Sequence, residues 1–140
     1  MKRNYQLSER EQQVMNFMWD KGEAVTSVEI LESLTDVMQN ATYVHRTINS
    51  LLASGFIREC GVVQHRTQYA RKFLPCMTRE EYAAKYLVKQ GIQRKSLGRV
   101  AMALINETQD SDYQNTRETV EELQKIIDEL KNQADNFRQG

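Results

Sequence analysis

The segment 40–55 limits the possible folds of this chain more than any other, because it has the sequence of one amphipathic helix with a capping residue at each end. Asn40 is a preferred N-cap, since its side-chain oxygen accepts from free amides of the first turn. Gly55 suits the left-handed conformation that ends many helices. Apolar residues recur at helical spacing and predict one buried stripe: Val44, Ile48, Leu51 and Leu52.

The face opposite this stripe is polar without being densely charged. It carries one cation, an amide, two hydroxyls, an imidazole and a phenol, on Thr42, Tyr43, His45, Arg46, Asn49 and Ser50. Such side chains hydrogen-bond to base edges and phosphates in a DNA groove. We therefore interpret the segment as a recognition helix and these residues as candidate DNA contacts. An ordinary solvated helix face remains the alternative.

The preceding residues predict the rest of a helix-turn-helix. Ser8 and Thr26 each stand three residues before a glutamate, a pattern in which the hydroxyl caps the first turn and the glutamate reaches back. The predicted helices run from Ser8 to about Lys21 and from Thr26 to about Met38. Because only a short turn separates the second of them from the recognition helix, the pair forms a helix-turn-helix unit.

After the recognition helix the apolar pattern changes to that of strands. Segments 56–60 and 69–74 predict a β-hairpin with a loop over 61–68. Polar residues at or near the loop tip are candidates for phosphate or minor-groove contact: Gln64, His65 and Arg66. Three helices followed by such a hairpin make a winged helix, so we expect a winged-helix DNA-binding domain over 1–76.

Residues 77–140 are expected to form a helical dimerisation region. Helices are predicted over 79–90, from Ser96 to about Asn106, and from about Asn115 onward. The last two carry apolar residues at helical or heptad spacing: Leu97, Val100, Leu104, Val120, Leu123, Ile127 and Leu130. This seam is too short for an independent coiled coil, so we expect a second copy to cover it in a homodimer. Folding back onto the chain's own core remains the alternative.

Charge is divided unevenly between these regions. The chain has 19 basic and 19 acidic residues and no net charge. Residues 1–99 nevertheless carry 15 basic and 10 acidic residues, whereas 100–140 carry 4 and 9. Such asymmetry favours a DNA-facing part joined to an acidic part with another task.

Composition argues against several other classes. The only two cysteines, Cys60 and Cys76, are too few for a disulfide framework, and there is neither a membrane-spanning apolar run nor an apolar signal core. We therefore expect a cytoplasmic protein with reduced thiols and no membrane contact. The cysteines with His45 and His65 lack metal-ligand spacing, so no metal or cofactor is predicted. No catalytic motif is found, so no enzyme is predicted. A Cys60–Cys76 redox switch remains open if the wing brings the thiols together.

Three segments resemble those of one bacterial family. They are the opening helix with Met18-Trp19-Asp20-Lys21-Gly22, the segment 47–55, and the junction Phe73-Leu74-Pro75 with 78–82. Together they resemble the penicillinase repressor family of the BlaI/MecI/CopY type. The resemblance implies a homodimeric winged-helix repressor. In such a dimer, the winged-helix domain of each subunit (its head) binds one half of a pseudo-palindromic operator. It also implies release by proteolysis or by metal binding to cysteines in the C-terminal part.

The chain departs from that family at three places. Its tail contains no cysteine, so copper sensing through paired Cys-x-Cys motifs is not expected. The segment 103–107 lacks the Asn-Phe bond that is cleaved in antibiotic-responsive members, which leaves a regulatory protease undecided. Ala41-Thr42-Tyr43 replaces the usual Pro-Lys-Thr and Ser50 replaces a late arginine, so the family's operator sequence does not carry over.

Taken together, these features predict a transcriptional repressor that occupies a double-stranded DNA operator as a homodimer. Two alternatives stay open. The first is a winged-helix regulator controlled by a small ligand or by thiol oxidation. The second is a winged helix used as a protein-interaction module. Affinity for duplex DNA that falls steeply with salt would distinguish DNA binding from the second alternative.

Overall fold

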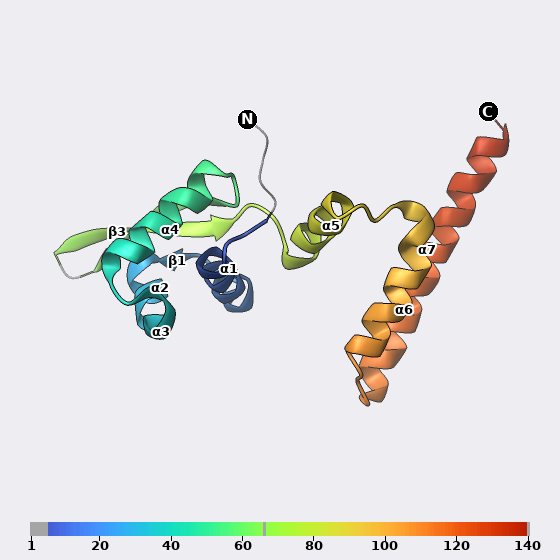
Figure 1. Cartoon of the computed structure of the whole chain (residues 1–140), viewed down its shortest axis with the longest axis horizontal. Helices are drawn as coiled ribbons and strands as arrows, with labels where there is room; N and C mark the ends of the chain where they lie inside the picture. The colour runs from blue at the N-terminus through green and yellow to red at the C-terminus, as the bar shows by residue number, and fades with distance from the viewer. Residues whose placement is uncertain (1–5, 66, 140) are drawn as a thin grey trace. The chain divides into compact units, whose positions relative to one another are not determined.

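The computed structural model describes residues 6–65 and 67–139. The chain divides into two compact units, one ending at Gln93 and the other beginning at Arg94 (Figure 1). The first unit contains, in order, α1 (Glu9–Lys21), β1 (Val25–Thr26), α2 (Ser27–Ser33), α3 (Thr35–Met38), α4 (Ala41–Ala53), β2 (Ile57–His65), β3 (Gln68–Pro75) and α5 (Arg79–Lys89). The second contains a 3-10 turn, η1 (Arg94–Ser96), followed by α6 (Leu97–Glu107) and α7 (Tyr113–Gln139).

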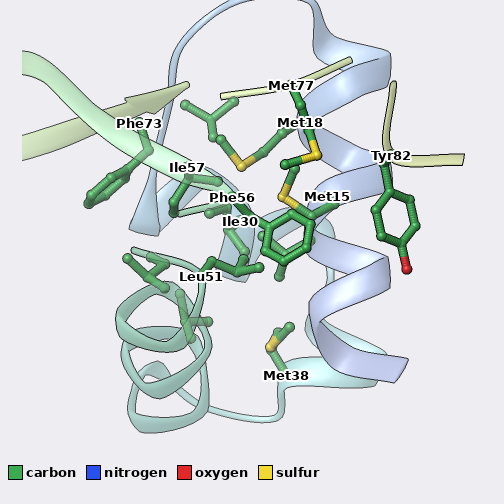
Figure 2. Close-up of a cluster of buried hydrophobic side chains, with 14 residues drawn as sticks. Met15, Met18, Ile30, Met38, Leu51, Phe56, Ile57, Phe73, Met77 and Tyr82 are labelled. Atoms are coloured by element: carbon green, nitrogen blue, oxygen red, sulfur yellow. The ribbon is translucent and has the colours of Figure 1, made fainter. Parts of the chain in front are cut away.

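The first unit is a winged helix, as predicted. Its strands form an antiparallel sheet in the order β1-β3-β2, and the long β2–β3 hairpin is the wing (Figure 1). The helices α1, α2 and α4 pack with this sheet around one core. Figure 2 shows Met15 and Met18 of α1, Leu51 of α4 and Phe73 of β3 meeting in that core with Phe56.

The predicted helix starts are confirmed by hydrogen bonds. The Glu11 amide donates to Ser8 Oγ (3.3 Å), and the Glu11 carboxylate accepts from the Ser8 amide (2.9 Å), which completes a capping box. The Tyr43 amide donates to Asn40 Oδ1 (3.2 Å), so Asn40 caps α4. Gly55 has a φ of 80° and follows the end of that helix.

Two local predictions were wrong because tertiary packing overrides local pattern. The helix expected over 26–38 is broken at Leu34, whose φ and ψ are −121° and 36°. Beyond the break, Met38 is fully buried, and Leu34 and Val37 pack against the core. The loop expected over 61–68 is mostly strand, since β2 continues to His65 and β3 begins at Gln68. A register shift between Glu59 and Gly61 accommodates this longer pairing.

The first unit extends beyond residue 76 because α5 packs against α1 and against Phe56, which precedes β2. The Tyr82 ring, 9% exposed, lies 5.9 Å from that of Trp19 and 5.7 Å from that of Phe56 between centroids. Arg79 Nη2 is 2.7 Å from Asp20 Oδ1, and Trp19 Nε1 donates to the Met77 carbonyl (2.9 Å). The compact unit therefore includes the helix that the sequence assigned to the dimerisation region.

The second unit is a pair of helices with no buried side chain in either. The start of α7 is held by Asp112 Oδ1, which accepts from the amides of Gln114 (2.8 Å) and Asn115 (3.3 Å). Asp110 accepts from the Asp112 amide (2.8 Å) and from Asn115 Nδ2 (2.9 Å). Hydrogen bonds to the charged form hold the pKa of Asp110 below its ordinary value.

Gly22→Ala is expected to destabilise the first unit by about 1–2 kcal/mol, the cost of a left-handed conformation for an L-residue. Gly22 has a φ of 71°, and its amide donates to the Met18 carbonyl (3.2 Å) to end α1. Gly22→Asn is the matched control, because asparagine tolerates this conformation better. Thermal unfolding followed by circular dichroism should show a larger loss for alanine. Equal losses would contradict this role of the left-handed cap.

Candidate DNA-binding surface

The helix α4 exposes the predicted polar face and buries the predicted apolar stripe. Val44, Ile48 and Leu51 are buried in the core, and Leu52 is half-buried against it. The candidate side chains lie outside: Thr42, His45, Arg46, Asn49 and Ser50 are exposed, and Tyr43 is half-buried. The structure therefore presents a continuous polar surface along one helix, with its backbone anchored by the buried stripe.

Within the described part of the chain, the side chains of His45, Arg46 and Asn49 make no hydrogen bond or ion pair. These three carry an imidazole, a guanidinium and an amide to the surface with their donors available. Arginine pairs with guanine edges or phosphates, and asparagine with adenine edges. The arrangement is chemically suited to reading a duplex groove.

The first turn of α1 supports two of the candidate residues. Ser50 Oγ donates to Glu11 Oε2 (3.0 Å), and the Arg10 guanidinium lies 4.1 Å from the centre of the Tyr43 ring. Sequence reasoning missed Arg10 and Glu11 as neighbours of this face, because only the crossing of α1 and α4 brings them there. Their effect is to orient Tyr43 and Ser50, while Arg10 adds a cation beside the helix.

The structure describes two of the three candidate residues predicted for the wing. Gln64 is exposed on β2 and pairs in register with Tyr69 of β3. The backbone of His65 ends β2 opposite Gln68, whereas Arg66 lies outside the described residues. The connection between the strands is therefore confined to residues 66 and 67, much shorter than the predicted loop.

A groove of about 320 Å³ separates the wing from α2 and α4. Its lining includes Ser27, Val28, His45, Gln68, Tyr69 and Arg71. Of these, sequence reasoning had singled out only His45 as a candidate contact. The strand period of Tyr69, Arg71 and Phe73 was a usable signal, because it places the three side chains on one side of the sheet.

The two cysteines are exposed and unpaired. The Cys76 amide donates to the Phe56 carbonyl (2.8 Å), so Cys76 lies beside Phe56. Cys60 follows Phe56 by four positions in the sequence. In a strand, four positions span about 13 Å, which is well beyond the roughly 7 Å between Cα atoms that a disulfide tolerates. The wing thus keeps the thiols apart, and the proposed intramolecular switch is not supported.

Among residues 6–65 and 67–139, no group of three or more His, Cys, Asp or Glu side chains is placed to hold a metal ion. In the same residues no helix combines the length and the apolar character needed to cross a bilayer.

The apolar residues predicted for dimerisation lie uncovered on the second unit. Leu97, Leu104, Val120, Leu123 and Ile127 are exposed, and Val100 and Leu130 are half-buried. None of them belongs to the buried core, which is made entirely by residues of the first unit.

Comparison with known proteins agrees with the architecture. A family model described as penicillinase repressor matches residues 7–129, which spans the winged helix and most of the second unit. A search of curated proteins found no match. Since the family match covers well over half of the chain, this protein belongs to the penicillinase repressor family of DNA-binding transcriptional repressors.

Proposed function

We propose that this protein is a homodimeric repressor that binds a pseudo-palindromic operator through α4 and the wing. The observation that carries the proposal is the exposed polar face of α4, held by a buried stripe in a winged helix of this family. In a helix-turn-helix the recognition helix lies in the major groove and its exposed side chains contact base edges.

Residue roles follow from position along α4. Arg46 and Asn49, exposed in the middle of the helix, are the proposed direct base contacts. Thr42 and Tyr43 lie in the first turn, where hydroxyls and free amides suit phosphate. The remaining proposed contacts are His45 and Ser50 of α4 and Gln64 and His65 of β2; Arg66, also predicted from the sequence, lies outside the described residues.

The proposed dimer forms through the second unit. Apolar side chains line both α6 and α7, and none is buried within one chain, so a second copy would remove them from water. A twofold dimer also presents two heads to two half-sites, which matches a palindromic operator. Repression is then steric, and any signal that weakens the dimer lowers operator occupancy.

The first test is selection of binding sites from random duplex DNA by the intact protein at about physiological salt. We expect enrichment of an inverted repeat whose half-sites are about one helical turn apart, or a multiple of that distance. A single unrepeated site would contradict the dimeric mode. Absence of enrichment together with absence of salt-sensitive duplex binding would instead favour a protein-interaction module.

A further inference from the structure

One face of the wing is buried at its base and exposed toward its tip. Tyr69, Arg71 and Phe73 alternate along β3 and therefore face the same side of the sheet. Phe73 is 1% exposed at the base, whereas Tyr69 is 72% exposed nearer the tip. A large aromatic side chain left this open is not explained by the core.

This side of the wing faces polar groups from two helices. The groove is lined by polar residues from three elements, Ser27 of α2, His45 of α4, and Gln68, Tyr69 and Arg71 of β3, together with the apolar Val28, Ile48, Ala70 and Phe73. Hydroxyl, amide and guanidinium donors are the usual phosphate contacts of DNA-binding proteins. Among the described residues that line the groove, Arg71 is the only arginine or lysine, and it supplies a permanent positive charge there.

In the free protein the Arg71 guanidinium is already paired with a carboxylate. Its Nη1 lies 3.4 Å from Glu59 Oε2 on the neighbouring strand, and both side chains are about half exposed. The Arg71 guanidinium also lies 5.3 Å from the centre of the Phe73 ring, within the range of a cation–π contact. A phosphate in the groove would therefore have to compete with the Glu59 carboxylate for the same guanidinium.

We propose that the groove holds the sugar-phosphate strand of duplex DNA, with Arg71 as its principal phosphate contact and Glu59 as a competitor that lowers affinity. This inference rests on the proposed DNA-binding function. Charge complementarity carries it, because the positive charge of an arginine among neutral polar side chains, beside the proposed recognition helix, attracts a phosphodiester. Glu59 thereby reduces sequence-independent affinity and makes operator binding depend more on base contacts.

The test is a double-mutant cycle on Glu59 and Arg71 with the selected duplex, measured by fluorescence anisotropy over a series of salt concentrations. Arg71→Gln should weaken binding about fivefold or more and reduce the logarithmic salt slope by about one per head. Glu59→Gln should tighten binding about two- to fivefold, the strength of an exposed ion pair. The tightening should disappear in the Arg71→Gln background.

Control variants distinguish competition between Glu59 and phosphate from an effect of net charge and from a loss of folding stability. Glu107→Gln makes the same change in net charge on α6 and should leave affinity unchanged. Arg71→Lys retains the positive charge and should preserve the salt slope, and thermal unfolding of each variant reports any loss of the wing. A merely structural role for Arg71 would lower stability without changing the slope.

Two failures are distinguishable. If the parent protein binds no duplex, the proposed function fails. In the other case, the parent protein binds duplex DNA while Glu59→Gln has no effect, or while it tightens binding equally with and without Arg71. Either result overturns the proposed competition between Glu59 and phosphate and leaves the proposed DNA binding intact.

Discussion

Ile127→Asp is expected to convert the proposed dimer into monomers and to reduce operator affinity by about 100-fold or more. Ile127 is 45% exposed on α7, in line with Leu123 and Leu130 along the proposed seam. A carboxylate there would have to be desolvated without a partner whenever two copies associate. Loss of the dimer removes the effective concentration that makes the second half-site bind, a factor of roughly 10²–10⁴.

Sedimentation or light scattering gives the mass of the variant, and anisotropy with the selected operator gives its affinity. Asn132→Asp is the matched control, since it adds the same charge to an exposed position of α7 that is not in the apolar seam. The control should remain dimeric. A dimeric Ile127→Asp with unchanged helicity would show that the seam is assigned to the wrong residues.

The second large effect is expected at α4, the proposed recognition helix. Arg46→Ala and Asn49→Ala should each weaken operator binding by about 1–3 kcal/mol, which is roughly 5- to 150-fold, because each removes a proposed bidentate base contact. Both side chains are exposed and make no hydrogen bond or ion pair within the described residues, so folding should change little. Arg46→Ala should also reduce the salt dependence if the guanidinium contacts a phosphate.

Two matched variants control this experiment. Arg99→Ala and Asn132→Ala remove the same side-chain types from exposed positions of α6 and α7 and should bind operator like the parent. Selection repeated with Asn49→Ala should relax the preference at one base pair of each half-site. If both α4 variants bind with parental affinity, α4 is not the recognition helix, even where the protein still binds DNA.

Capping residues in the sequence were sufficient to locate the helix ends that depend only on neighbouring residues. The capping box at Ser8, the Asn40 cap and the left-handed Gly22 and Gly55 mark helix ends in the sequence, and the structure has them there. A cap works this way because its hydrogen bonds join residues only a few positions apart. The buried stripe of α4 was predictable for a similar reason, since helical geometry alone places those side chains on one side.

Long-range packing decided the remaining features. The short strand β1 forms because Val25 is placed opposite Phe73, which is distant in sequence. The helix break at Leu34 accompanies the burial of Met38 among core residues that are distant in sequence. The register shift beside Cys60 likewise depends on both strands of the hairpin. No short window of sequence contains both partners of such contacts.

The sequence by itself determined the winged-helix class, the helix α4 and the polar face that this helix exposes, because these follow from periodicity and capping within single segments. Only the tertiary structure placed α5 with the winged helix, set Arg10 and Glu11 beside α4, and brought Ser27, His45 and Arg71 around one groove. Those arrangements join side chains from different elements, and their positions follow from how the elements pack around a shared core.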